Sequence, residues 1–273
     1  MEPTPPRAKS RTRAFLLGFA LVAPLVSLAL IRTNIVLALA PLFLSHALLL
    51  YATLLPASQW WGPVITGFNT AAKEVWLTFD DGPSPEHTLG ILDLLDRFNA
   101  RATFFVIGAH AEKYPHLVTE ILMRGHAIAN HTYTHPSGTF WYAGPSRVDT
   151  EIARCSALSR STPDRPPRLF RAPAGMKSPF LHPALARRGM ILVGWTVRGL
   201  DTVRRDSARV AERIAKRARP GAIILLHEGH QTRRDPEFAI RCAERTLQRL
   251  TASGFAFVIP SPEQLRTTPG DEK

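Results

Sequence analysis

Two adjacent carboxylates, Asp80 and Asp81, end an apolar run in the segment EVWLTFDDGPSP, and a Gly-Pro turn follows them. A carboxylate can take up a proton or bind a cation, so the pair suits acid–base or metal chemistry. Successive side chains of a regular strand point to opposite faces, which would separate these two groups. We therefore expect the chain to leave regular strand geometry here.

Two histidines, His131 and His135, stand four residues apart in HTYTH. On a helix this spacing would place both imidazoles on one face, where they could bind one metal ion. Taken alone, such a pair is more often an ordinary core or surface feature. An aspartate from elsewhere would complete a set of two imidazoles and a carboxylate, which leaves metal positions open for water and substrate. No glutamate stands inside the pair, which excludes the HExxH arrangement of zinc proteases.

Further polar residues follow other apolar runs: Arg171 in RAPAG, Asp201 after GWTVRGL and His227 in LLHEG. A hydrolase needs an acid that protonates its leaving group, and His227 could supply the proton. The alternative for His227 is a histidine that ends a core strand. Arg171 could equally belong to a turn with a structural salt bridge.

Short β-rich apolar runs alternate with amphipathic stretches from Glu74 onward, which is typical of βα units around a parallel sheet or barrel. The expected strands are EVWLTFD, ATFFVIG, HAIANH, LFRAP, ILVGWTV, AIILLHE and FAFVIP. The polar residues named above lie at or after the carboxyl ends of these runs. In a barrel of parallel strands those ends meet on one face, so we expect one site.

Two apolar blocks, 14–31 and 35–55, precede this region, and Arg32 is the only Lys, Arg, Asp or Glu between Arg13 and Lys73. Each block is about as long as the ~20 residues that a membrane helix needs. The basic flank 1–13 predicts a cytoplasmic amino terminus. A two-helix hairpin in a bacterial-type inner membrane would return the rest of the chain to the cytoplasm, and a single span would leave it outside. A cleaved signal peptide is the third possibility.

The net charge is +12, of which residues 73–273 carry +8. A basic domain beside a membrane suits anionic lipid headgroups or phosphate-bearing substrates. The arginines lack the interleaved aromatics of a single-strand binding surface, so we expect no nucleic acid partner. Cys155 and Cys242 have no CxxC partner, and we expect buried thiols. The sequence specifies no oligomeric state.

The order of TFDDG (78–82), HTYTH (131–135), RAPAG (171–175), Asp201 and LLH (225–227) resembles that of the polysaccharide deacetylase family. This family is also called the NodB homology domain or carbohydrate esterase family 4, and the resemblance covers about residues 73–260. It implies a distorted (β/α)7–8 barrel and metal-dependent removal of N-acetyl, or O-acetyl, groups from a sugar.

The resemblance also implies a role for each matching residue. The metal, most often Zn²⁺ with Co²⁺, Ni²⁺, Mn²⁺ or Fe²⁺ as alternatives, would be held by Asp81, His131 and His135. Asp80 would be the general base, oriented by Arg171, and His227 would be the general acid, tuned by Asp201. The Ala174 N–H would stabilise the oxyanion and Leu225 would line the acetyl pocket.

Three positions depart from the family pattern. Ala174 stands where Tyr or Phe is usual, and Arg198 and Thr202 stand where an aspartate and a tryptophan are usual. Arg198 could suit an anionic substrate, such as a sugar on a lipid phosphate, or it could be a solvated arginine. These departures leave the substrate less defined than the chemistry.

We therefore expect a membrane-anchored deacetylase that acts on an acetylated glycan or a lipid-linked amino sugar and contacts membrane lipids. The alternative is a non-catalytic carbohydrate-binding or scaffold protein that retains the fold. The expected organisation is a basic cytoplasmic segment 1–13, two transmembrane helices within 14–55, a linker 56–72, the deacetylase domain 73–262 and a tail 263–273.

Overall fold

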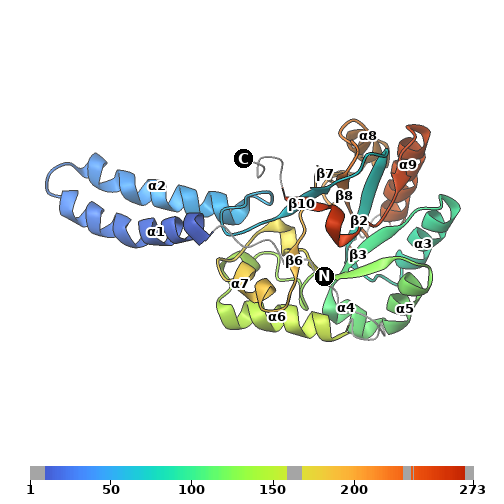
Figure 1. The fold of residues 1–273 in the computed structure, drawn as a ribbon, viewed down its shortest axis with the longest axis horizontal. Helices are drawn as coiled ribbons and strands as arrows, with labels where there is room; N and C mark the ends of the chain where they lie inside the picture. The colour runs from blue at the N-terminus through green and yellow to red at the C-terminus, as the bar shows by residue number, and fades with distance from the viewer. Residues whose placement is uncertain (1–9, 159–167, 230–234, 236, 268–273) are drawn as a thin grey trace.

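The computed structural model describes residues 10–158, 168–229, 235 and 237–267. Over these ranges an apolar helical hairpin precedes an α/β barrel (Figure 1). The α-helices are α1 (Ser10–Leu30), α2 (Ile35–Leu54), α3 (Thr88–Arg97), α4 (Gly108–Lys113), α5 (Pro115–Met123), α6 (Pro145–Leu158), α7 (Leu181–Ala186), α8 (Ser207–Ala215) and α9 (Phe238–Ala252). The strands are β1 (Ile65–Phe68), β2 (Glu74–Gly82), β3 (Ala102–Val106), β4 (Ala127–Asn130), β5 (Leu169–Phe170), β6 (Ile191–Leu192), β7 (Val197–Arg198), β8 (Ala222–His227), β9 (Ala256–Phe257) and β10 (Leu265–Thr267).

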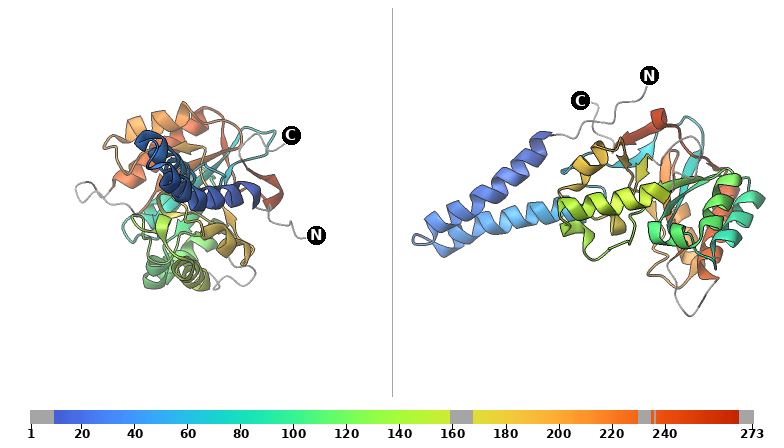
Figure 2. Two further views of the ribbon diagram at one scale, coloured as in Figure 1. Left: turned by 90° about the vertical axis from the view of Figure 1, so that its left-hand side faces the viewer. Right: turned by 90° about the horizontal axis from the view of Figure 1, so that it is seen from below.

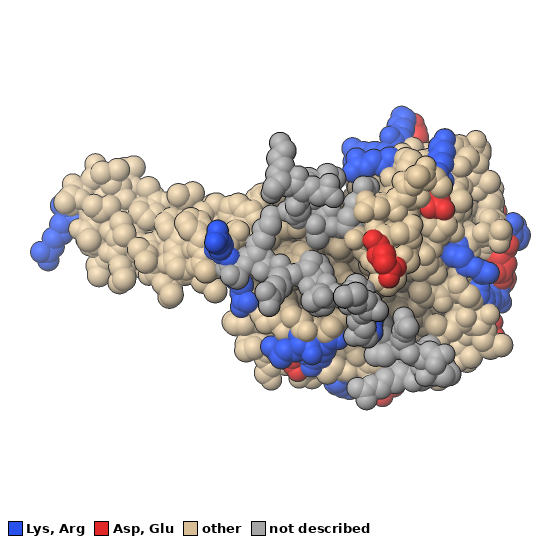
Figure 3. Space-filling view, viewed as in Figure 1, with Lys and Arg blue, Asp and Glu red and all other residues tan. Residues whose placement is uncertain are grey.

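Helices α1 and α2 pack against each other and project from the barrel as one arm (Figure 2). Asn34 caps α2, because its side-chain oxygen accepts the N–H groups of Val36 and Leu37. Arg11–Leu30 and Ile35–Leu54 are each long and apolar enough to cross a membrane. In Figure 3 the visible surface of the arm carries charge only at its tip and near the barrel. The two apolar helices expected from the sequence are therefore present and are candidate membrane spans.

The strands of the barrel follow the order β1-β8-β2-β3-β4-β5-β6. Neighbours from β8 to β6 pair in parallel, and β1 pairs with β8 in the antiparallel sense. A single bridge between Ile65 and Val193 joins the two ends of this order. The sheet is thus a nearly closed barrel that is distorted where β5 and β6 are only two residues long. This architecture confirms the expected fold.

Strand β2 shows how the alternation of side chains creates both the core and the site. Val75, Leu77 and Phe79 belong to the apolar cluster that also contains residues of α3 and α9. The alternate residue Trp76 packs in a second cluster with Phe105 of β3 and Ile223 of β8. Period-2 geometry then turns Thr78 and Asp80 to the same face as Trp76. The polar end of β2 is therefore the continuation of an apolar interior row.

Two strands lie in segments that the sequence marks as a linker and a tail. β1 falls within 56–72, and β10, which pairs with β1 in the antiparallel sense, falls within 263–273. Both are short, and Gly67 interrupts the pattern of β1, so neither gives a strand signal in sequence. The run ILVGWTV forms two strands, β6 and β7, because Gly194 between them turns to donate its N–H to the Ile65 carbonyl.

The arm is fixed to the barrel where α2 ends. Lys177 donates its backbone N–H to the Thr53 carbonyl at 2.9 Å, and its Nζ donates to the carbonyls of Leu55 at 2.5 Å and Pro56 at 2.9 Å. A buried Trp61 donates its indole N–H to the Thr53 hydroxyl at 3.1 Å. The three Lys177 bonds satisfy carbonyls at and just after the end of the helix that have no partner within it.

Candidate active site

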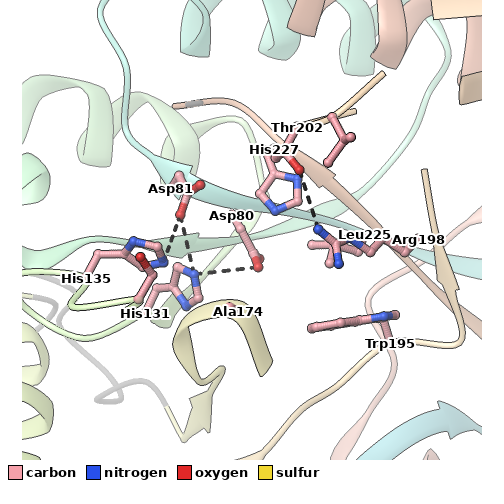
Figure 4. Close-up of a pocket in the computed structure, with 12 residues that line it drawn as sticks. Asp80, Asp81, His131, His135, Ala174, Trp195, Arg198, Thr202, Leu225 and His227 are labelled. Atoms are coloured by element: carbon pink, nitrogen blue, oxygen red, sulfur yellow. Dashed lines mark hydrogen bonds and ion pairs between the residues drawn. The ribbon is translucent and has the colours of Figure 1, made fainter. Parts of the chain in front are cut away.

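One pocket, about 290 Å³ in volume, lies at the carboxyl ends of the barrel strands. Figure 4 shows its lining side chains converging from β2, the β4–α6 loop, β7 and β8. The residues that line it are Asp80, Asp81, His131, His135, Ser137, Ala174, Trp195, Arg198, Thr202, Val203, Leu225 and His227. Of the residues expected from the sequence, only Arg171 and Asp201 do not line it, and each contacts a residue that does.

Asp80 is held by the fully buried guanidinium of Arg171, whose Nη1 donates to Asp80 Oδ1 at 2.6 Å. The same Nη1 donates to the Thr78 hydroxyl at 2.8 Å, and Nη2 donates to the Gly194 carbonyl at 2.9 Å. The guanidinium also lies 4.0 Å from the centre of the Phe105 ring. Several fixed acceptors and the rings of Phe105 and Trp195 restrict Arg171 to one orientation, so Arg171 fixes Asp80 in turn.

Asp81 reaches the same pocket because β2 is irregular at its end. The pairing of β2 with β3 shifts register between Asp80 and Gly82, and Asp81 has a φ of 72°. A bulge of this kind gives one strand an extra residue and re-aims its side chain. The departure from regular strand geometry that the sequence required is therefore present, and both carboxylates face the pocket.

The two histidines of HTYTH converge without a helix. Thr132 and His135 both have positive φ, 67° and 52°, so the chain doubles back on itself. The carboxylate of Glu151 on α6 holds this loop by accepting the N–H groups of Tyr133 at 2.9 Å and Thr134 at 2.8 Å. The helical rationale for the spacing is thus wrong, although the expected meeting of the imidazoles is correct. Glu151 gives no signal in sequence, because it stands 16 residues beyond the motif.

The donor set of Asp81, His131 and His135 fits a divalent metal ion. One ligand atom from each lies within 4.8 Å of the others, and Asp81 Oδ1 is 3.5 Å from His131 Nε2 and 3.3 Å from His135 Nε2. Tetrahedral ligands about 2.1 Å from a zinc ion are about 3.4 Å apart. His131 Nδ1 lies 2.8 Å from the Arg171 carbonyl, so Nδ1 carries a proton and Nε2 presents a lone pair.

The pKa shifts of Asp81, His131 and His135 also bear on metal binding. Burial disfavours ionisation of Asp81, but the hydrogen bond and charge of His131 outweigh burial and lower its pKa well below its usual range. Burial, followed by the charge of His131, lowers the pKa of His135 to about 4, which keeps that imidazole neutral. Burial also acts against protonation of His131, yet the carboxylates of Asp80 and Asp81 raise its pKa. A proton and a metal ion would compete for the His131 lone pair.

His227, at the end of β8, is paired with a buried carboxylate. Asp201 Oδ2 accepts the backbone N–H of His227 at 2.7 Å, and its oxygens lie 3.1 and 3.2 Å from Nδ1. Burial lowers the pKa of His227, but Asp201, and then Asp80 and Asp81, raise it to about 9. The imidazole is therefore protonated at neutral pH, and Nε2 is left for the pocket because Nδ1 faces Asp201.

Ala174 and Leu225 complete the wall near the carboxylates. Ala174 lies in the turn Pro173–Gly175 with a φ of 53°, and Leu225 is buried in β8. Because alanine carries only a methyl group, no ring projects into the pocket from this turn. Trp195 supplies the aromatic face of the pocket instead.

A buried glutamate that sequence reasoning missed supports the bulge from behind. Glu228 is fully buried beside the Asp80–Gly82 bulge, and it accepts the Thr88 hydroxyl hydrogen at 2.7 Å. A Cβ atom on Gly82 would lie only 1.4 Å from Glu228 Oε1, so Gly82 is required by close packing. Burial is the main cause that raises the pKa of Glu228 to about 8. In the sequence, the signal for Glu228 is its position directly after His227.

A barrel with carboxylates and imidazoles gathered in one pocket at its strand ends is the arrangement of a hydrolase of the (β/α) barrel class. The profile of the family described as Polysaccharide deacetylase matches residues 68–192. A chitooligosaccharide deacetylase of Bradyrhizobium sp. (strain ANU 289) is 35% identical over 196 residues, which is 71% of this chain and 87% of that protein. The chain belongs to the polysaccharide deacetylase family.

Two further relatives agree with this membership. A peptidoglycan-N-acetylglucosamine deacetylase of Bacillus cereus is 30% identical over 69% of this chain and 67% of its own length. The solved structure of a family 4 carbohydrate esterase from Streptomyces lividans, in complex with acetate, matches with a TM-score of 0.63 and 31% identity over 74% of this chain and all of that chain. The protein is thus a carbohydrate deacetylase, which disfavours a non-catalytic scaffold.

Proposed function

We propose that the protein is a membrane-anchored, metal-dependent deacetylase that removes N-acetyl, or O-acetyl, groups from an amino-sugar-containing glycan or a lipid-linked sugar. The observation that carries the proposal is the division of the pocket into separately held groups. Arg171 holds Asp80 and Asp201 holds His227, while Asp81 lies against His131 and His135, and His131 Nε2 is 3.6 Å from Asp80 Oδ2. Amide hydrolysis needs a base, an acid and an electrophile in one place.

Asp81, His131 and His135 would hold the divalent ion, for which Zn²⁺ suits two imidazoles and a carboxylate. When bound, the ion supplies Lewis acidity, which activates water and polarises the acetyl carbonyl. The coordinating atoms are imidazole nitrogens and a carboxylate oxygen, so Co²⁺, Ni²⁺, Mn²⁺ and Fe²⁺ are alternatives.

The remaining residues divide the proton transfers between them. Asp80, oriented by Arg171, would accept the proton of the water that attacks the carbonyl carbon. The backbone N–H of Ala174 would donate to the oxyanion, and Leu225 would contact the acetyl methyl. Protonated His227 would donate its Nε2 proton to the departing amine as the C–N bond breaks. The products are acetate and a free amino sugar.

Chelation and substitution of Asp80 test this proposal directly. We expect removal of divalent ions to abolish acetate release from N-acetylglucosamine oligomers, and Zn²⁺ to restore it. Asp80→Asn keeps the shape of the side chain but cannot accept a proton, so we expect a loss of about 10² to 10⁴ in rate. The exposed Asp93→Asn variant serves as the control. Full activity after chelation, or in Asp80→Asn, would refute the mechanism.

A further inference from the structure

The two sides of the pocket differ in charge. Figure 4 shows Asp81, His131 and His135 on one side and Arg198 and Trp195 on the other, with Asp80 between them. Arg198 ends the short strand β7, which pairs with β8 beside Leu225. A cation therefore faces the pocket across from the proposed metal ligands.

The positive charge of Arg198 has few compensating partners among the described residues. Its Nη2 donates to the Thr202 hydroxyl at 3.4 Å, and Nε is buried without a hydrogen-bond acceptor in the part of the chain that the structure describes. Among the described residues, no carboxylate forms an ion pair with Arg198. A half-buried guanidinium without a carboxylate is costly unless an anion binds it.

One arginine contacts Arg198, and further arginines lie near that one. Arg213 of α8 donates its Nε to the Arg198 carbonyl at 3.1 Å. Desolvation, followed by the charges of Arg217, Arg204 and Arg198, lowers the pKa of Arg213, so these cations lie close enough to repel one another. Figure 3 shows basic side chains gathered over α8. The rim beside β7 thus has a positive potential that would favour an anion.

The wall next to Arg198 meets the end of the apolar arm. A Cβ atom on Gly175 would lie 2.6 Å from both Pro56 and the ring of Trp195. Pro56 follows α2 directly, and Trp195 lines the pocket. If α2 ends at a membrane surface, this side of the pocket lies beside that surface.

We propose that the pocket selects an acetylated amino sugar that carries a phosphate, that Arg198 binds this phosphate, and that the membrane surface presents the substrate. This inference rests on the deacetylase function proposed above. In a 2-acetamido sugar the anomeric carbon adjoins the carbon that bears the acetamide. A phosphate on that carbon would face Arg198 while the acetyl group faces Asp80, and Arg is well suited to bidentate phosphate binding.

Three substrates distinguish the sources of this phosphate. Acetate release by the full chain in phosphatidylcholine vesicles is measured on a neutral chitooligosaccharide, on soluble N-acetylglucosamine 1-phosphate, and on N-acetylglucosamine joined by phosphate to a polyprenyl lipid. We expect kcat/KM to rise from the first to the last. Arg198→Gln should lose about tenfold or more on both phosphate substrates and less than twofold on the neutral one, and Arg198→Lys should retain part of the preference. Arg209→Gln, an exposed arginine of α8, is the matched control.

Equal loss on all three substrates in Arg198→Gln would overturn the phosphate site and leave the deacetylase function standing. Equal rates on the two phosphate substrates would overturn presentation by the membrane. Acetate release from none of them would contradict the proposed function itself. Calorimetric binding of N-acetylglucosamine 1-phosphate to the chelated protein provides a second measurement, since it needs no turnover. Binding should weaken about tenfold in Arg198→Gln, and unchanged binding would overturn the role of Arg198.

Discussion

The pairing of His227 with Asp201 sets the protonation state that the proposed acid requires. Asp201 contacts both the backbone N–H and Nδ1 of His227, and its charge is the main cause that outweighs burial and raises the imidazole pKa to about 9. A raised pKa keeps the proton on His227 at neutral pH and releases it only as the pH passes about 9. The alkaline limb of the pH–rate profile should therefore report this residue.

Asp201→Asn keeps the hydrogen-bonding shape and removes the charge. We expect the alkaline limb of kcat/KM to move down by about 1 to 2 pH units, because an opposite charge at this distance shifts a pKa by about that amount. Activity at pH 6 should fall less than activity at pH 8. The measurement is acetate release between pH 5 and pH 10, with Asp93→Asn as the control. Superimposable alkaline limbs would show that Asp201 does not tune His227.

At the scale of elements, the bulge at the end of β2 depends on the packing of Glu228 against Gly82. Gly82→Ala would place a methyl group 1.4 Å from Glu228 Oε1, inside a fully buried region. We expect it to cost about 1 to 3 kcal/mol of the free energy of unfolding, as overpacking does, and to weaken Zn²⁺ binding by displacing Asp81. Gly138→Ala, where no atom lies within 4 Å, is the control.

A double-mutant cycle separates this packing from a general effect of either substitution. The double variant Gly82→Ala with Glu228→Ala should recover more than half of the Zn²⁺ affinity that Gly82→Ala loses, because the clash is removed. Thermal unfolding and metal titration provide the two measurements. Strict additivity of the two substitutions would mean that Glu228 does not shape the bulge.

The junction between α2 and the barrel gives a second test at this scale. Burial lowers the pKa of Lys177 to about 7, and its Nζ donates to the carbonyls of Leu55 and Pro56. Lys177→Met keeps the apolar stem and removes both bonds. We therefore expect faster proteolysis at 55–62 and a decrease of about 1 to 3 kcal/mol in the free energy of unfolding. Lys216→Met, at an exposed ion pair of α8, should change neither quantity. Equal proteolysis of both variants would contradict the role of Lys177 in fixing the end of α2 to the barrel.

The sequence predicts a strand well when the strand's own residues carry the pattern, and poorly when distant partners fix it. The runs that form β2, β3 and β8 are long and apolar, and Asp80, Asp81 and His227 follow from their ends. β1 and β10 are short and are fixed by partners far along the chain, so their sequences carry no pattern. The convergence of His131 and His135 depends on positive φ angles and on Glu151, and neither is visible in a spacing of four residues.

For the whole molecule, the arm and the barrel together predict an orientation in the membrane. α1 leaves the barrel side and α2 returns to it, so the basic start of α1 and the barrel lie at the same end of the arm (Figure 1). That end carries Arg11 and Arg13, with Arg7 and Lys9 before them in the sequence, whereas the turn at the far tip carries only Arg32. If the arm crosses a membrane, the positive-inside rule predicts a cytoplasmic barrel.

Reporter fusions measure this orientation. A fluorescent protein fused after Lys273 should fluoresce and alkaline phosphatase at the same position should be inactive, whereas phosphatase fused after Thr33, in the turn, should be active. All three fusions should stay with the membrane after carbonate extraction. Active phosphatase at both positions would indicate a single span, and a released barrel that lacks 1–40 would indicate a cleaved signal peptide. A cytoplasmic barrel would have access to lipid-linked precursors but not to finished wall polymer, so the same fusions also limit which acetylated sugars can reach Asp80.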